Sequence, residues 1–415
     1  MVSPFLPDDQ KVAAVREALP ATAAGIYLDT ATRGPLPAET ARAMAEVQDW
    51  ELRVGRVGAD ADEELQVRLL EARAALAAVL RASPDEIALT HGLAGAMSAG
   101  AWAVAWRPGD GAVTTPLGPE AGAGALWSLR ERLGVVVTVA RAGDGADPEG
   151  ILAAVEAAIR PGTRLVAVPH VDAATGAVLP VRRLADLAHA HGALLLVDGG
   201  QAAGAIPVEV RELGADLYAV AGERWLLGPD GTGGLWVSPV AAERLRPAFT
   251  GLGSFASFDP SVAAGELWPD ARRFEAGGYH RPSVVGLARS CGWLSMYVGL
   301  PWAHERARHL AGRAADLLRD VPGVAVLTPP GTPAGLVTFR IAGWEARAAA
   351  EELGRRTFAL LRPVPGLDAL RIAVAFFNTE AELERLRDGV AELAGHTPET
   401  LPPRRRLTIL GPGEQ

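Results

Sequence analysis

From Gly150 onwards the chain alternates between helical and strand-like segments, and this alternation restricts the fold more than any other feature. The helical segments are amphipathic, whereas the strand-like segments are short apolar runs. The helical segments are 151–159 and 181–192, and the strand-like segments are 164–171, 193–200, 216–222 and 231–239. Such alternation is typical of βαβ units, so we predict an α/β fold with a mainly parallel sheet.

After residue 270 the sequence changes to long amphipathic helices followed by short strands and a closing helix. The predicted helices cover 284–300, 302–321 and 379–395, and the predicted strands cover 324–329, 335–341 and 370–376. We therefore expect a large α/β domain over 26–270 and a smaller α+β domain over 271–415. Residues 1–25, with a helix at 8–19, are expected to pack on the small domain.

Composition excludes several classes of function. A net charge of −9 and a pI near 5.5 argue against nucleic-acid binding, and the arginine run 404–406 is expected to be a solvated tail. The sequence has neither a signal-peptide pattern nor an apolar run long enough to cross a bilayer, which favours a cytoplasmic protein without a membrane partner. The single cysteine, Cys291, excludes an internal disulfide and a cysteine-based metal cluster.

Polar side chains follow two of the predicted strands, where ligands bind in open parallel sheets. His170 ends one strand, Asp198 ends the next, and Gln201 follows on the same loop. A turn cap at Asp198 and a packing role for His170 are the structural alternatives. The glycine-rich segment 228–234 fits a tight turn better than a phosphate-binding loop. No metal site is expected, so the residues alone indicate an enzyme-like α/β protein with a site near His170, Asp198 and Arg224.

Several segments, in the right order, resemble the class V aminotransferase and cysteine desulfurase family of fold type I enzymes, which use pyridoxal phosphate (PLP) and include isopenicillin N epimerase-like proteins. The resemblance covers nearly the whole chain. The matching segments are GIYLDTATRGPLP, VPHVDAATGAVLPV, LLVDGGQAAGAIPVEVRELGAD, RRFEAGG and LRIAVAFFNTEAELERL. It implies a large domain with a seven-stranded, mainly parallel sheet, a smaller C-terminal domain and a homodimer with the site at its interface.

The resemblance also implies roles for four residues that this chain retains. An aspartate at the position of Asp198 pairs with the cofactor's pyridinium nitrogen, and a glutamine at the position of Gln201 binds its phenolic oxygen. A histidine at the position of His170 lies beside the ring. An arginine at the position of Arg371 binds the substrate carboxylate, for which a guanidinium fork is suited.

The remainder of the family site is changed. The Ser-x-His-Lys segment, whose lysine forms the Schiff base, corresponds here to residues 221–224, which read Ala-Gly-Glu-Arg. Apolar Leu93 and Ala94 stand where hydroxyl donors for the phosphate are expected, and the family's Gly-Thr becomes Gly277 and Gly278. An arginine cannot replace a lysine that forms a covalent imine, and the only lysine of the chain, Lys11, lies outside this segment.

We therefore expect no cofactor, and a PLP-independent enzyme of specialised biosynthesis that performs elimination, cyclisation or condensation on a carboxylate-bearing small molecule. His170 or Glu223 would move a proton, while Arg224 and Arg371 would hold the substrate. Three alternatives stay open. They are a non-catalytic homologue or partner subunit, lyase or aminotransferase chemistry with PLP or its amine form (PMP) bound non-covalently, and an engineered Lys→Arg variant. A set of tryptophans (Trp102, Trp106 and Trp127) is expected in the core or around the cavity.

Overall fold

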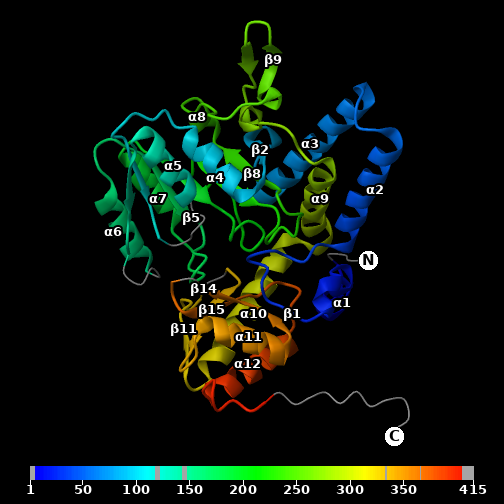
Figure 1. Ribbon diagram of the computed structural model, residues 1–415, viewed down its shortest axis with the longest axis vertical. Helices are drawn as coiled ribbons and strands as arrows, with labels where there is room; N and C mark the ends of the chain where they lie inside the picture. Colours follow the sequence, from blue (N-terminus) through cyan, green and yellow to red (C-terminus); the bar gives the residue numbers. More distant parts are fainter. Residues whose placement is uncertain (1–4, 117–121, 143–146, 332–333, 365, 404–415) are drawn as a thin grey trace.

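The computed structural model describes residues 5–116, 122–142, 147–331, 334–364 and 366–403. Figure 1 shows a large sheet with helices on both of its faces and, below it, a smaller sheet covered by helices. The predicted α/β fold is therefore confirmed. In this part of the chain, no helix has the length and apolar character required to span a membrane.

The large sheet has seven strands within the described residues. In spatial order they are β2 (Ile87–Thr90), β8 (Gly233–Val237), β7 (Leu217–Ala221), β6 (Leu194–Asp198), β5 (Thr163–Pro169), β3 (Gly111–Thr114) and β4 (Val136–Val139). The pairings from β7 through to β4 are parallel, whereas β8 is antiparallel to both β7 and β2. One edge of the sheet therefore contains the start of β8 together with the carboxyl ends of β3, β5, β6, β7 and β2.

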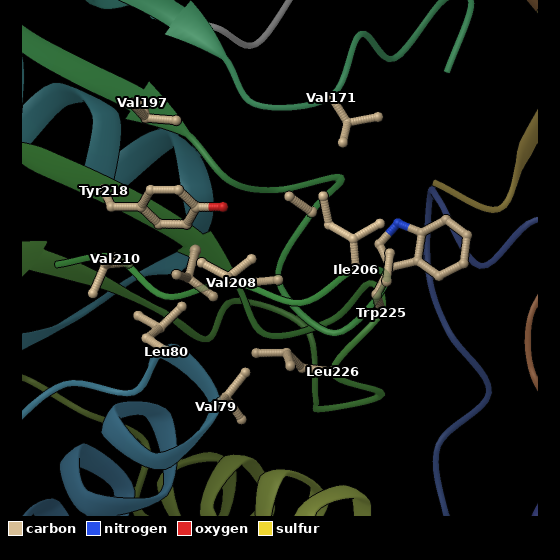
Figure 2. Close-up of a cluster of buried hydrophobic side chains, with 14 of the residues drawn as sticks. Val79, Leu80, Val171, Val197, Ile206, Val208, Val210, Tyr218, Trp225 and Leu226 are labelled. Carbon is tan, nitrogen blue, oxygen red and sulfur yellow. The ribbon is translucent and has the colours of Figure 1, made fainter. Parts of the chain in front are cut away.

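The large sheet is buried on both faces because successive residues of its central strands enter two different apolar clusters. Val197 and Tyr218 face the cluster with α3, α6 and α7, whereas Leu196 and Leu217 face the cluster with α4 and α5. Figure 2 shows part of the first cluster, which includes Trp225 at its edge. The covering helices are α3 (Ala59–Leu80), α4 (Gly92–Trp102), α5 (Ala123–Leu133), α6 (Pro148–Ala158) and α7 (Val181–Ala190).

The small sheet is antiparallel, with the order β11-β12-β15-β14 among the described residues. Its strands are β11 (Val324–Val326), β12 (Leu336–Ile341), β15 (Ala369–Ala373) and β14 (Arg362–Val364). A third apolar cluster joins it to α10 (Leu300–Arg319), α11 (Ala346–Thr357) and α12 (Glu380–Ala394). A parallel pair of short strands, β1 (Ile26–Tyr27) and β13 (Ala359–Leu360), lies beside it.

The N-terminal helix α1 (Asp8–Ala18) is bound to the part of the chain that carries the small sheet. Trp302 on α10 donates its indole N–H to Asp8 (3.0 Å), and Arg16 donates to the Phe377 carbonyl (3.0 Å). Lys11 is buried, with its ammonium 4.1 Å from the centre of the Trp302 ring. Lys11 is therefore committed to its contact with α10.

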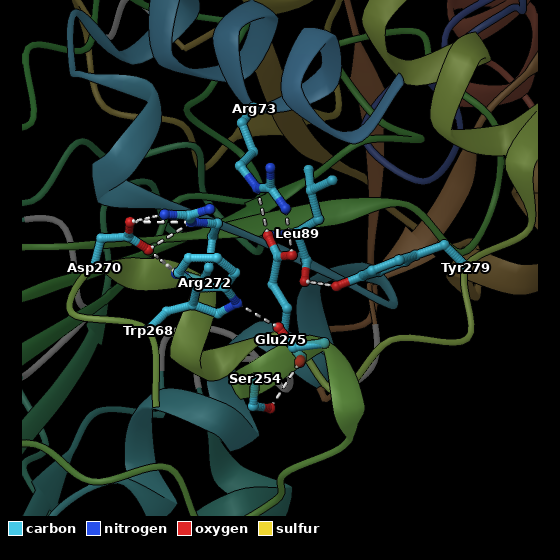
Figure 3. A network of polar contacts seen from close by, with 9 residues as sticks. Arg73, Leu89, Ser254, Trp268, Asp270, Arg272, Glu275 and Tyr279 are labelled. Carbon is cyan, nitrogen blue, oxygen red and sulfur yellow. Dashed lines mark hydrogen bonds and ion pairs between the residues drawn. The ribbon is translucent and has the colours of Figure 1, made fainter. Parts of the chain in front are cut away.

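A buried ion pair joins the first half of the chain to the segment that follows the large sheet. Arg73 on α3 binds both carboxylate oxygens of Glu275 (2.8 and 2.7 Å), and Glu275 also accepts the Leu89 N–H (2.9 Å). Figure 3 shows this pair with Ser254, which donates to the Glu275 carbonyl, and Tyr279, which donates to the Leu89 carbonyl. The network fixes the short helix η4 (Ala271–Phe274) against β2.

Two segments differ from the sequence-based expectation. A hairpin of β9 (Phe255–Asp259) and β10 (Ala264–Leu267) projects from the molecule, at the top of Figure 1, where no strand was predicted. The predicted helix 284–300 is an α-helix, α9 (Arg281–Gly292), followed by a π-helical turn, η5 (Trp293–Val298). Gly299 then adopts φ +83°, which ends η5 and separates it from α10. The remaining elements are α2 (Ala38–Val54), α8 (Pro239–Ala242), η1 (Pro20–Ala23), η2 (Pro84–Glu86) and η3 (Leu252–Ser254).

Candidate functional site

The sheet brings three of the predicted site residues to one edge. Pro169 and Asp198 are register partners, and Asp198 is also the partner of Ala219, so β5, β6 and β7 end side by side. His170 follows β5, Asp198 ends β6, and Arg224 lies shortly after β7. All three side chains are buried. The structure thus places the polar groups together as the strand-end argument predicted.

Asp198 and Arg224 meet above the backbone of Gly200. The Gly200 N–H donates to Asp198 Oδ1 (2.8 Å). A Cβ at Gly200 would lie 3.0 Å from both Asp198 Oδ1 and Arg224 Nη1, and 2.5 Å from Leu93 Cδ2. The carboxylate, the guanidinium and the apolar tip of Leu93 therefore surround the point where a Cβ at position 200 would lie, and a side chain there requires Leu93 to move.

His170 is a neutral ring in this site. Its Nδ1 lies 2.9 Å from the Tyr218 hydroxyl, and the two rings are nearly perpendicular (89°). Burial lowers the pKa of His170 to about 4, and burial also raises the pKa of Tyr218, with Asp198 adding to the rise. At neutral pH the imidazole is therefore uncharged, which suits packing beside an aromatic ring better than donation of a proton.

Gln201 is held at both ends of its amide. Its Nε2 donates to the Ala31 carbonyl (2.9 Å), and its Oε1 accepts the indole N–H of Trp225 (2.9 Å). Trp225 directly follows Arg224, and no local pattern indicates its contact with Gln201, 24 residues earlier. Only the apolar character of Trp225 was visible in the sequence, where it indicates a core residue.

Glu223 lies on the more exposed side of the same segment. Its side chain is half-buried, and its carbonyl accepts the Gly34 N–H (2.8 Å). The pKa of Arg33 is raised, first by its hydrogen bond to Asp230 and more weakly by Glu223, which places Glu223 and Arg33 near each other. The loop after β1 consequently covers the Glu223–Arg224 backbone.

Arg371 comes from the small sheet but contacts the loop that follows His170. It lies on β15 and donates Nη1 to the Ala173 carbonyl (2.7 Å). The neighbouring strand β12 contacts the same loop, because Thr338 donates to the Ala174 carbonyl (2.6 Å). Burial raises the pKa of Asp172 in this loop, while hydrogen bonds from Thr175 and Ala174 and the charge of Arg371 oppose the rise. Arg371 is thus brought to the site's side of the small sheet.

Other residues singled out in the sequence lie elsewhere. Cys291 is fully buried, and burial raises the pKa of its thiol to about 12. Trp102 and Trp106 are partly buried against the α4–α5 cluster, whereas Trp127 is 57% exposed. The carbonyl of Gly277 lies 3.2 Å from His91 Nε2. The described part of the chain holds no group of three His, Cys, Asp or Glu residues suited to a metal ion.

Comparison with known proteins agrees with this fold. The family model for class V aminotransferases matches residues 26–386, and the chain belongs to this family. A probable cysteine desulfurase from Methanothermobacter thermautotrophicus is 29% identical over 92% of this chain and 98% of its own length. The isopenicillin N epimerase of Streptomyces clavuligerus is 30% identical over 89% of this chain and 95% of its own.

Solved structures share the fold at lower identity. A mutant of the cystine C-S lyase C-DES, with glycine covalently linked to its PLP cofactor, superposes with a TM-score of 0.86 at 23% identity, covering 91% of this chain and 99% of that one. The apo cysteine desulfurase from Thermococcus onnurineus gives a TM-score of 0.81 at 24% identity, covering 95% and 100%. The fold is therefore that of the fold type I PLP enzymes.

One expectation from the sequence was wrong. We expected no cofactor, but the structural neighbours are PLP proteins, and one holds PLP covalently linked to glycine. The expectation gave too much weight to the altered phosphate positions and too little to the side of the site that would hold the ring. The structure keeps Asp198, Gln201 and His170 buried at the same edge of the sheet.

Proposed function

We propose that this protein is an enzyme that binds PLP or PMP non-covalently and acts on a carboxylate-bearing small molecule. The observation that carries the proposal is the grouping of Asp198, Gln201 and His170 at the carboxyl edge of the large sheet, all buried. A buried carboxylate, an amide and a neutral imidazole form a set that suits a protonated pyridine ring with a phenolic oxygen.

The covalent link is where the site departs from the family. We propose that Arg224 takes the position of the family's lysine, as the matching segment indicates. A guanidinium stays protonated and is a poor nucleophile, so Arg224 cannot form an imine with an aldehyde. Its charge beside Asp198 and Gly200 instead suits an anionic group on the cofactor or substrate.

Four residues of this site would then have distinct roles. Asp198 would hold the protonated ring nitrogen, Gln201 would donate an N–H to the phenolic oxygen, and His170 would lie beside the ring. When bound, the cofactor supplies an electron sink for bonds broken next to an amino group. Arg371 would hold the substrate carboxylate from the small-sheet side, where it already contacts the loop after His170.

Glu223 is the better candidate for moving a proton. His170 has a pKa of about 4 and is therefore a weak base at neutral pH. Glu223 is half-buried at the margin of the site, with its Oε2 buried. Elimination or transamination in a specialised biosynthetic pathway fits these roles.

A second function is favoured by the hydrogen bonds of Gln201. Both ends of its amide are bound within the fold, to Ala31 and Trp225, so Gln201 can persist for structural reasons alone. This observation supports a non-catalytic homologue that acts as a partner subunit. Alanine variants of His170, Glu223 and Arg224 that leave product formation intact would identify such a protein.

We further propose a homodimer, the division into domains at residues 25 and 270, and a cytoplasmic location. Exposed apolar side chains on two projecting parts of the molecule support the homodimer. They are Leu52, Val54 and Val57 at the α2–α3 tip and Phe258 and Val262 on the β9–β10 hairpin. Sedimentation of the purified protein as a monomer at micromolar concentration would contradict it.

The test of the main proposal is a titration with PLP and PMP, followed by absorbance, borohydride reduction and intact mass. We expect saturable spectral changes with both forms and no pyridoxyl mass on residue 224 after reduction. Lys11→Arg serves as the control, since it removes the only lysine and leaves the site unchanged. If neither PLP nor PMP binds, the proposal is overturned and the non-catalytic partner subunit is favoured.

A further inference from the structure

The amide of Gln201 can adopt one orientation only. Its oxygen faces the indole N–H of Trp225, and its nitrogen faces the carbonyl of Ala31, at 2.9 Å in both cases. A flipped amide would place N–H against N–H and oxygen against oxygen, and would lose both hydrogen bonds inside a buried site. The Ala31 carbonyl and the Trp225 N–H therefore act together to fix which end of the amide is a donor.

Trp225 is itself held in place from the small sheet. A Cβ at Gly335 would lie 2.9 Å from Trp225 Cη2, and Gly335 has φ +72°. Gly335 directly precedes β12, and its carbonyl accepts the Val374 N–H (2.8 Å), so it belongs to the hydrogen-bonded sheet that also carries Arg371. The indole thus touches the small sheet with its ring and the site with its N–H. Figure 2 shows the ring beside Ile206.

We propose that Trp225 is a positioning residue that makes Gln201 a hydrogen-bond donor toward the cofactor's phenolic oxygen. Because the indole packs against Gly335, the small sheet also sets the position of that donor. The small sheet would then contribute twice to the site, through the carboxylate-binding Arg371 and through Trp225. This inference rests on the proposed function, since it assumes that PLP or PMP binds at Asp198 and Gln201.

The test compares two variants with two matched controls, using PMP as the probe. Trp225→Phe keeps an aromatic ring and removes the N–H, while Gly335→Ala adds a methyl group 2.9 Å from the indole and 2.7 Å from the Val374 carbonyl oxygen. Trp236→Phe removes a buried indole bond, from Trp236 Nε1 to Glu86 (2.9 Å), away from the site. Gly343→Ala controls for the cost of an alanine at positive φ, because Gly343 has φ +80° with no neighbouring atom within 4 Å of the added Cβ.

We expect Trp225→Phe and Gly335→Ala to weaken PMP binding about five- to tenfold, the effect of one buried hydrogen bond. Binding by both controls should match the wild type, although their unfolding temperatures fall. Trp225→Phe should also raise the pKa of the bound phenol, read from absorbance against pH. Equal affinity of Trp225→Phe and wild type, or equal losses in Gly335→Ala and Gly343→Ala, would overturn the inference.

A second measurement separates this inference from the proposed function. NMR of the Gln201 side-chain amide in the protein without cofactor should show a different carbonyl carbon shift in Trp225→Phe, because this variant removes the donor to Oε1 while Ala31 still accepts from Nε2. If PMP does not bind to the wild type, the proposed function fails, and with it the proposed donation to the cofactor. Identical carbonyl shifts in the two proteins would show that Trp225 does not hold the amide.

Discussion

Two buried regions of this molecule combine an arginine with a carboxylate, and they serve different ends. Arg73 and Glu275 form a two-pronged pair that joins α3, β2 and η4 (Figure 3). Arg224 and Asp198 instead meet at the ends of parallel strands, around the backbone of Gly200. The residue types are the same, so position in the fold, and not chemistry alone, separates a structural pair from a candidate site.

The largest effect on stability is expected when the Arg73–Glu275 pair is broken. Glu275→Gln leaves the buried Arg73 without its counter-charge, and it should lower the free energy of unfolding by about 3–5 kcal/mol. Urea unfolding with intrinsic tryptophan fluorescence measures this loss. A loss below about 1 kcal/mol would mean that the pair contributes no more than a surface ion pair and that the comparison fails.

The candidate site should respond to acid through His170. Its pKa in the folded protein is about 4, below the ordinary value of 6.5, so the unfolded chain binds more protons between these values. The contribution of His170 to stability is then fully present above pH 6.5 and is lost as the pH drops toward 4, by about 1.4 kcal/mol per pH unit and about 3 kcal/mol in all. Urea unfolding at a series of pH values measures this slope.

His304 provides a comparison within the same chain. Burial lowers its pKa to about 4 as well, against a backbone hydrogen bond involving Gly204. His170→Asn should therefore remove about half of the acid dependence and leave the remainder. An unchanged slope in this variant would show that His170 is not the group responsible.

Asp198→Asn tests whether Asp198 differs from Glu275, because this variant should affect cofactor binding more than folding. Loss of a charged partner for the ring nitrogen is expected to weaken PMP binding about 10- to 100-fold, equivalent to about 1.5–3 kcal/mol. Isothermal titration gives the affinity. Unchanged affinity, together with lower stability, would place Asp198 in the same structural class as Glu275.

The smallest effect on stability is expected from Arg224→Lys, at about 1 kcal/mol or less, because both residues carry a positive charge on a long stem. This variant should nevertheless form a borohydride-reducible covalent bond to PLP, detected as a pyridoxyl mass on residue 224. Lys11 is the internal control for non-specific labelling, since it lies over Trp302. If residue 224 gains no mass, Arg224 does not occupy the position proposed for it.

Local sequence patterns predicted the central part of the large sheet well. The buried runs that became β5, β6 and β7 are apolar on both faces because both faces are covered, so each run is recognisable by itself. The β9–β10 hairpin was missed because its residues are mostly exposed and carry no such signal. The ends of the central strands then led directly to His170 and Asp198.

The remainder of the site depends on contacts that leave no local trace. Gln201 and Ala31 are 170 residues apart, and the structural pair outside the site, Arg73 and Glu275, is separated by 202. Trp225 is apolar and looks like an ordinary core residue in the sequence. The residues next to it along the chain do not indicate that its N–H reaches Gln201. Residues of this kind become visible only when the distant segments are placed in space.

Gly200 limits how this protein can change over generations. A methyl group at this position would lie 2.5 Å from Leu93 Cδ2 and 3.0 Å from Asp198 Oδ1 and Arg224 Nη1, which come from separate segments. Leu93 would have to move to admit it, and the two charged groups would have to shift slightly. A glycine retained here in descendants of this chain would therefore record a packing constraint, and would give no information on whether they still catalyse a reaction.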